Sequence, residues 1–216
     1  MGKLVIFGGS GGLGKPLSEK LKSDYDVVAL SSKDVDVTKF NEVKDFFVNN
    51  DIDIVLNLRG YNYNMILYNY TGEEGVEVKK QIEINIEGNL NILANCLPKM
   101  RDNGYGRIIL TSSVLSSKPV IGTGVYSGCK AFIDNLIKTC TLENIDRGIT
   151  CNALQLGYFD GGLVYQIPIP IREQIKESIP LKRWGSIIEL ENSVRYLINT
   201  EYVSGCSLKI NGGLHF

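Results

Sequence analysis

The sequence predicts an α/β domain built on a doubly wound, mostly parallel sheet, and three observations favour this fold class. Short β-branched runs alternate with helical segments along the 216 residues. A glycine-rich turn joins the first predicted strand to the first predicted helix. No repeat, low-complexity tract or linker interrupts the alternation, so we expect residues 1–216 to form a single domain.

Each element follows from its own local pattern. Strands are expected at residues 3–7, 27–30, 35–37, 53–58, 107–111, 150–154 and 207–210. Helices are expected at residues 15–22, after a cap at Thr38, and at 78–100, 127–147 and 188–199. Residues 161–179 contain several prolines and are expected to be irregular, serving either as a substrate cover, as a lid packed on its own domain or as a subunit contact.

The strand predicted at residues 35–37 is the weakest of these assignments. Only a few residues separate it from the preceding strand, whereas a parallel crossover usually needs a dozen or more. Either the connecting helix is missing or this strand is rudimentary.

Composition excludes several classes of function. The net charge of −1 provides no electrostatic basis for binding nucleic acid or an anionic membrane. No run approaches 18 apolar residues and no secretory signal is visible, so we expect a cytoplasmic protein. The cysteines number five and include no C-x-x-C pair, which favours reduced thiols. The only histidine, His215, has no cluster of ligands beside it, so no metal site is expected.

The glycine-rich turn runs from Gly8 to Gly14 with the sequence GGSGGLG. Glycine lets the backbone adopt a positive φ and lets a diphosphate approach the N–H groups, and the following helix N-terminus favours an anion. The turn therefore predicts a nucleotide site. Its candidate residues are Gly8, Ser10, Gly11, Gly12, Leu13 and Gly14.

The end of the second predicted strand bears on which nucleotide is bound. NAD-binding folds place an acid there to hold the ribose 2′-hydroxyl. Here Ser31, Ser32 and Lys33 occupy that position, and no carboxylate follows until Asp34. Hydroxyls and an ammonium suit a 2′-phosphate, so NADP(H) is favoured and NAD(H) stays open. A solvated loop with an incidental lysine is the alternative interpretation.

The segment Tyr126-Ser-Gly-Cys-Lys130 carries the predicted chemistry. Its phenol and ammonium are four residues apart, which places both on one face of a helix. A nearby ammonium favours the phenolate and so lowers the cost of deprotonation. Such a pair can exchange a proton with a carbonyl or an alcohol, and Ser113 lies upstream of it.

Together these motifs resemble the short-chain dehydrogenase/reductase family, in its single-domain branch, almost from end to end. Asp36 and Val37 match a pair that contacts adenine in that family, and Leu156-Gly157 stands where it has Pro-Gly. The segment Asn57, Leu58, Arg59 and Gly60 stands where the family has Asn-Asn-Ala-Gly. The matching catalytic tetrad is Asn85, Ser113, Tyr126 and Lys130.

The resemblance implies a Rossmann fold and a role for each member of the tetrad. Tyr126 would exchange the proton, Lys130 would lower its pKa and hold the nicotinamide ribose, and Ser113 would orient the carbonyl. Asn85 would fix a water that links Lys130 to solvent. The implied protein is an NADP(H)-dependent oxidoreductase for a small carbonyl or secondary alcohol, assembled as a homodimer or homotetramer through helices 78–100 and 127–147.

Departures from the family pattern leave one rival function open. Leu58 and Arg59 alter the adenine wall, Leu156 replaces the proline, and Gly161 stands where a threonine often holds the cofactor amide. The alternative is a catalytically silent regulator or scaffold that senses a dinucleotide on the same fold.

Overall fold

The computed structural model describes residues 2–214, so His215 lies outside the described residues. Its centre is a six-stranded sheet in the order β2-β1-β3-β4-β5-β6, with every neighbouring pair parallel. The strands are β1 (Lys3–Phe7), β2 (Asp26–Leu30), β3 (Ile54–Asn57), β4 (Gly106–Ser113), β5 (Ile149–Leu156) and β6 (Ser207–Ile210).

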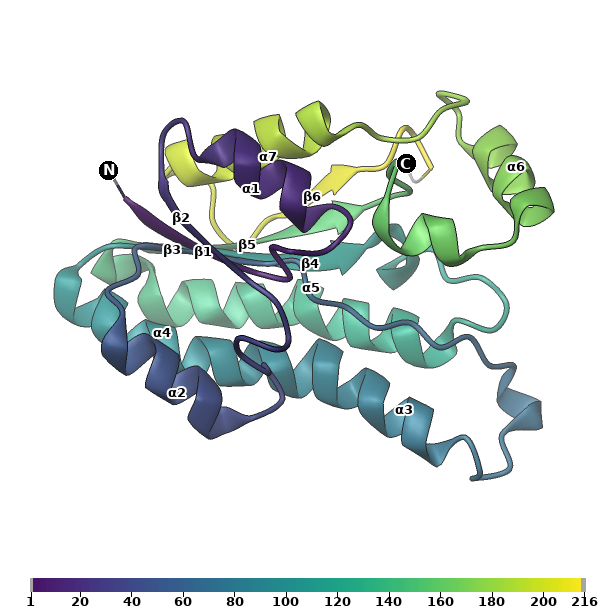
Figure 1. Ribbon diagram of the computed structural model, residues 1–216, viewed down its shortest axis with the longest axis horizontal. Coiled ribbons are helices and arrows are strands. Elements are labelled where there is room, and N and C mark those ends of the chain that lie inside the picture. Colours follow the sequence, from purple (N-terminus) through teal and green to yellow (C-terminus); the bar gives the residue numbers. More distant parts are fainter. Residues whose placement is uncertain (1, 215–216) are drawn as a thin grey trace.

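Helices cover both faces of the sheet (Figure 1). On one face lie α1 (Gly14–Leu21) and α7 (Ile187–Asn199). On the other lie α2 (Phe40–Asn49), α4 (Gly88–Asn103) and α5 (Gly124–Asn144). A π-helical turn, Glu83–Glu87, joins α3 (Gly75–Ile82) to α4, so the predicted helix 78–100 is one continuous rod with a local defect.

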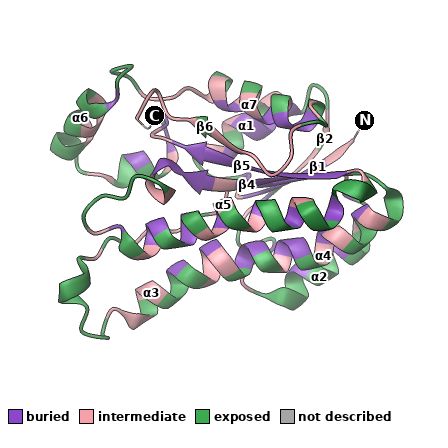
Figure 2. Cartoon of the chain, turned by 180° about the vertical axis from the view of Figure 1, so that it is seen from behind, coloured by how far each residue is buried: buried purple, intermediate pink, exposed green. Residues whose placement is uncertain are grey.

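Strand alternation divides the core into two layers, and burial is concentrated on the strands and on the helix faces toward them (Figure 2). Along β1, Val5 and Phe7 pack toward α2, α4 and α5, whereas Leu4 and Ile6 pack toward α1 and α7. Both sides of β1 are therefore apolar, as expected for a parallel sheet covered on both faces.

The order of the strands reverses at β1, which pairs with β2 on one side and with β3 on the other. Ligands of open α/β sheets bind beyond the carboxyl ends of the strands at such a point. The glycine-rich turn follows β1 there, and residues 57–60 end β3 beside it.

The strand predicted at residues 35–37 does not form. Val35 and Val37 are buried in the core, and the Val37 carbonyl accepts a hydrogen bond from Asn91 of α4 at 2.9 Å. With no crossover helix after β2, the chain passes straight onto the helical layer and cannot extend the sheet edge. Thr38 is not the cap either, since its hydroxyl bonds Asp36 and the N-cap residue of α2 is Lys39.

The prediction that residues 161–179 are irregular was also wrong. They contain a 3₁₀ turn (Gly162–Gln166) and the helix α6 (Ile169–Ser178), which has Pro170 in its first turn, where a missing N–H costs nothing. None of the residues of α6 is buried, and Figure 1 shows it projecting beyond the carboxyl edge of the sheet. No helix in the described ranges is both long and apolar enough to cross a bilayer.

Two glycine substitutions should have opposite effects on stability. A Cβ on Gly14 would collide with the Gly8 carbonyl oxygen, whereas one on Gly128, in the exposed interior of α5, would meet nothing within 4 Å. Gly14→Ala should therefore lower the free energy of unfolding. Gly128→Ala should raise it by about 0.5–1 kcal/mol, because alanine favours the helix. Urea denaturation of both variants measures this, and equal effects would contradict the turn geometry.

Candidate active site

The structure gathers the predicted tetrad at the carboxyl end of the sheet. Tyr126 and Lys130 lie on α5, Ser113 ends β4, and Asn85 lies in the π-helical turn. All four are buried, with exposed fractions of 8%, 1%, 7% and 0% respectively. The Lys130 Nζ lies 5.5 Å from the centre of the Tyr126 ring.

Gly60 marks where the lysine and the asparagine converge. A Cβ placed on this residue would lie 3.6 Å from Lys130 Nζ and 3.5 Å from Asn85 Oδ1. The absence of a side chain at position 60 therefore leaves room beside the ammonium. The sequence pattern had assigned Gly60 to cofactor binding, and the structure places it against Lys130.

Ser113 is held by the chain that follows it. Its Oγ accepts a hydrogen bond from the Leu115 N–H at 3.2 Å and so caps the 3₁₀ turn Val114–Ser116. Because the hydroxyl accepts there, its own hydrogen stays available to a partner. A hydrogen bond from Ser113 also favours the Tyr126 phenolate.

The phenol of Tyr126 is less acidic than the sequence pattern implied. Burial raises its pKa to about 12, and the Ser113 hydrogen bond opposes this rise only in part. Lys130 Nζ lies 5.5 Å from the centre of the Tyr126 ring and donates to the Thr111 carbonyl at 2.7 Å rather than to the phenol. That the Lys130 charge lowers the Tyr126 pKa therefore stays a prediction.

Lys130 itself is strongly affected by burial. Desolvation lowers its pKa to about 8, and the charges of Cys129 and Asp134 oppose that fall. An ammonium has three donors, and the Thr111 carbonyl is the one acceptor that residues 2–214 provide. Two donors therefore stay available on the side of Gly60.

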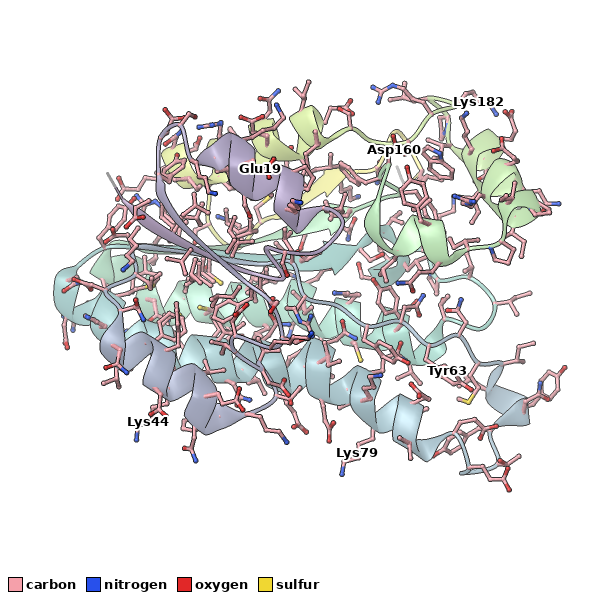
Figure 3. The ribbon with its side chains drawn as sticks, viewed as in Figure 1. Glu19, Lys44, Tyr63, Lys79, Asp160 and Lys182 are labelled. Carbon is pink, nitrogen blue, oxygen red and sulfur yellow. The ribbon has the colours of Figure 1, made fainter. Side chains whose placement is uncertain are left out.

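Two amide side chains of the α3–α4 rod hold the segment that follows β3. Asn85 donates to the Tyr61 carbonyl at 2.7 Å and accepts from the Tyr61 N–H at 3.4 Å. Gln81 accepts from the Tyr63 N–H at 2.8 Å and donates to the Tyr63 carbonyl at 3.5 Å. Each side-chain amide thus makes the pair of backbone hydrogen bonds that a residue of a neighbouring strand would otherwise make. Figure 3 shows Tyr63 next to α3.

This arrangement, which we call the amide ladder, extends to Asn89, whose Oδ1 accepts from Asn57 at 2.8 Å. The steps of Gln81 and Asn85 match Tyr63 and Tyr61, because two extended residues span about 6.6 Å and four helical residues about 6 Å. Asn89 instead meets the side chain of Asn57, four residues before Tyr61. Gln81 and Asn89 were missed from the sequence. The available signal was three amide residues at fourfold spacing, centred on Asn85.

The glycine-rich turn offers unpaired donors. Within the described chain, the N–H groups of Ser10, Gly12 and Leu13 have no acceptor, and α1 begins without a side-chain cap or an acid in its first turn. This set suits a diphosphate. One side is closed, because a Cβ on Gly12 would lie 2.6 Å from the Gly162 nitrogen.

Hydrogen bonds between its own residues hold the loop after β2. Asp34 Oδ2 accepts from the Ser31 N–H at 2.7 Å and from the Ser31 hydroxyl at 2.6 Å, and these bonds lower the pKa of Asp34. Ser32 and Lys33 are exposed beside it. The structure therefore adds a carboxylate at the place where the sequence suggested only hydroxyls and an ammonium.

The remaining predicted cofactor residues lie around the same edge. The Asp36 carboxylate accepts from Thr38, and Val37 is buried in the core. The Gly157 N–H donates to the Ile210 carbonyl at 2.9 Å. Leu58 packs partly buried against the core on the α1 and α7 side.

Tyr158 was not predicted as a site residue. It follows β5, and burial raises its pKa. The phenol lies close enough to Tyr126 that its ionised form would raise the Tyr126 pKa. The ring of Trp184 packs against it edge-on, with 6.1 Å between ring centres. No cluster of metal-binding side chains exists among the residues described.

Comparison with known proteins identifies relatives. The sequence profile described as enoyl-(acyl carrier protein) reductase matches residues 6–215. A 3-oxoacyl-[acyl-carrier-protein] reductase of Aquifex aeolicus is 28% identical over 98% of this chain and 86% of its own. An acetoacetyl-CoA reductase of Rhizobium meliloti is 32% identical over 76% of this chain and 68% of its own. For the nodulation protein G of Azospirillum brasilense the identity is 37%, over 62% of this chain and 56% of that protein.

Solved structures share the fold. A gluconate 5-dehydrogenase from Burkholderia cenocepacia, in complex with NADP and tartrate, has a TM-score of 0.89 over 99% of this chain and 94% of its own, at 21% identity. The fold and the profile define a dinucleotide-binding oxidoreductase of the Rossmann class. Within that class, the chain belongs to the short-chain dehydrogenase/reductase family.

Replacing Gln81 tests the amide ladder. Gln81→Leu leaves the Tyr63 N–H and carbonyl without partners, so the free energy of unfolding should fall by about 1–3 kcal/mol. Hydrogen exchange at Tyr61 and Tyr63 should accelerate. Asn95→Leu is the matched control, since the Asn95 amide donates only to its own helix. Unchanged exchange at Tyr63 in Gln81→Leu would show that the ladder does not hold this segment.

Proposed function

We propose that this protein is an NADP(H)-dependent oxidoreductase that interconverts a small-molecule carbonyl and a secondary alcohol through Asn85, Ser113, Tyr126 and Lys130. The convergence of a protonated phenol, the Ser113 hydroxyl beside it and an ammonium that has a single acceptor in the described chain carries the proposal. This cluster lies at the carboxyl edge of the sheet, where the glycine-rich turn also ends.

The surroundings of the tetrad suit each role. With a pKa of about 12, Tyr126 is protonated at neutral pH and can donate its proton to a carbonyl oxygen. Ser113 would donate its hydroxyl hydrogen to the same oxygen and stabilise the charge that develops on it. The Asn85 side chain bonds the Tyr61 backbone, so its part is to hold the segment after β3 next to Lys130.

The residues at the turn fit a dinucleotide. The N–H groups of Ser10, Gly12 and Leu13 would hold the diphosphate, and the spare donors of Lys130 would hold ribose hydroxyls. A bound NADP(H) supplies or accepts the hydride. NADP is favoured because Lys33 is exposed after β2 and the gluconate 5-dehydrogenase of the same fold was solved with NADP. The reductase names of the relatives support the reaction class.

Assembly and location complete the proposal. We expect a cytoplasmic homodimer or homotetramer in which α4 and α5 pair with a second copy. Leu90 on α4 is 41% exposed and Leu142 on α5 is 82% exposed, which is costly for apolar side chains facing water. Size-exclusion chromatography with light scattering tests this, and a monomer at micromolar concentration would contradict it.

A silent dinucleotide sensor is the second candidate. The altered adenine wall at Leu58 and Arg59 favours it, because this departure concerns cofactor binding and not the tetrad. Thermal shifts with NADP(H) and NAD(H), followed by turnover on a panel of ketones and sugars, separate the two functions. Binding without turnover would identify the sensor.

Tyr126→Phe tests the proton donor. Removing one hydroxyl should lower kcat at least about 100-fold with dissociation constants for the cofactor unchanged, because the phenol acts on the carbonyl oxygen. Tyr105→Phe, on the opposite edge of the sheet beside Arg107, is the control and should keep the wild-type rate. Turnover by Tyr126→Phe at the wild-type rate would refute the assignment.

Lys130→Met tests the cost of the buried charge. Lowering a lysine pKa from 10.5 to about 8 destabilises the folded state by about 3 kcal/mol at neutral pH. Below pH 8 the variant should therefore be inactive yet melt no lower than wild type. Because the pKa of Lys130 is lower in the folded state, this destabilisation of wild type disappears as pH rises from 8 to 10.5. Over that range the melting temperature of wild type should rise relative to that of Lys130→Met. A variant that melts lower at pH 7 would contradict this account.

A further inference from the structure

Arg59 is the one arginine in the described chain that has no partner for its guanidinium. Its backbone N–H donates to Asn57 Oδ1 at 3.0 Å, which fixes the residue just beyond β3. Its Nε is enclosed and makes no hydrogen bond. The side chain forms neither a salt bridge nor a hydrogen bond within residues 2–214, and it is only partly exposed.

Every other arginine has a partner in the structure. Arg183 pairs with Glu189, Arg195 with Glu191 and Asp24, Arg147 with Asp146, Arg101 with the Glu143 carbonyl, Arg107 with the Ile198 carbonyl, and Arg172 with the ring of Tyr165. A buried guanidinium nitrogen without an acceptor is costly, and the Nε of Arg59 is such an atom. The exception at position 59 therefore calls for an anion that this chain does not provide.

The position of Arg59 indicates which anion. A Cβ on Gly8 would lie 3.3 Å from Arg59 Cδ, so the side chain crosses the first residue of the glycine-rich turn. Gly8 lies between β2 and β3, because Phe7 pairs with Leu30 on one side and with Asn57 on the other. Arg59 thus borders the turn from the β3 side, opposite the loop of residues 31–34.

That loop is poorly suited to hold a phosphate alone. The Ser31 hydroxyl donates to Asp34 Oδ2 at 2.6 Å, and the Asp34 carboxylate would repel a second anion. Lys33 is left as its only cation, on an exposed and flexible stem. Arg59, in contrast, is only partly exposed, has a buried Nε and is anchored through its backbone N–H by Asn57. A planar guanidinium can form two parallel hydrogen bonds to a phosphate.

We propose that Arg59 binds a phosphate group of the dinucleotide and is the main cationic determinant of cofactor affinity in this chain. This inference rests on the proposed function, in that it takes a dinucleotide as the ligand. Two sources of the same chemistry border the turn, namely the diphosphate and the 2′-phosphate of NADP(H).

The test measures binding without turnover. Isothermal titration would give dissociation constants of NADPH, NADH, 2′,5′-ADP and 5′-ADP for wild type, Arg59→Ala and Arg59→Lys. Losing a charge-assisted hydrogen bond of about 1.5–3 kcal/mol should weaken binding by Arg59→Ala about 10- to 100-fold. Arg59→Lys keeps the charge but not the planar group, so it should be intermediate. Arg101→Ala, with its partners on α5, is the matched control and should bind as wild type does.

The ligands whose affinity falls in Arg59→Ala identify the phosphate group that Arg59 binds. A loss confined to NADPH and 2′,5′-ADP identifies the 2′-phosphate, and an equal loss for all four ligands identifies the diphosphate side. Arg59→Ala should melt no lower than wild type without ligand, since its guanidinium has no partner to lose.

Other results would overturn the inference. Binding by Arg59→Ala within twofold of wild type, or tighter than wild type, would show that the guanidinium does not hold a phosphate. Wild-type protein that binds none of the four ligands would refute this inference and the dinucleotide function together. Wild-type protein that binds NADPH through Arg59 but reduces no carbonyl would refute the proposed reaction alone.

Discussion

The burial of the Lys130 ammonium is the constraint on which the rest of this site depends. The protein places a charge where only 1% of the residue meets solvent and provides one acceptor, the Thr111 carbonyl at 2.7 Å. Such a charge is stable only when further acceptors arrive or when it loses its proton. Burial lowers its pKa to about 8, and Gly60, which has no side chain, leaves room beside the ammonium.

The amide ladder explains how that environment is maintained. Gly60 belongs to an extended segment that follows β3, and such a segment has no neighbouring strand at this edge of the sheet. Asn85 and Gln81 supply the missing hydrogen bonds from a helix. The π-helical turn shifts the helix at Asn85, a type of defect that often occurs at functional sites. The same residues therefore satisfy the backbone of this segment and form the surroundings of Lys130.

Much of this could be predicted from the sequence, and the parts that failed share a cause. The parallel sheet, the glycine-rich turn and the tetrad are encoded in local runs and fixed spacings, such as Tyr126 and Lys130 on one helical face. The strand at residues 35–37 failed because its fate depends on a crossover helix that this chain lacks. The helix α6 was missed because a proline such as Pro170 indicates the end of a helix unless it is known to lie in the first turn.

The pKa of Tyr126 and the partner of Asn85 depend on burial and on contacts between segments far apart in the chain. The sequence indicates which residues lie near the phenol, but it does not show that the Lys130 ammonium donates to the Thr111 carbonyl. Arg59 illustrates the same point, because an unpaired guanidinium is visible only once every other acceptor has been placed.

The most direct test of the central claim is the ionisation of Lys130 itself. Carbon-13 NMR of the lysine εCH₂ groups, with Lys130→Met to assign the signal, would follow this residue as pH is raised in the ligand-free protein. The account predicts a midpoint near pH 8 that rises when NADPH binds, because bound acceptors favour the charged form. A midpoint near the ordinary lysine value of about 10.4 would show that the ammonium is solvated, and it would contradict this description of the site.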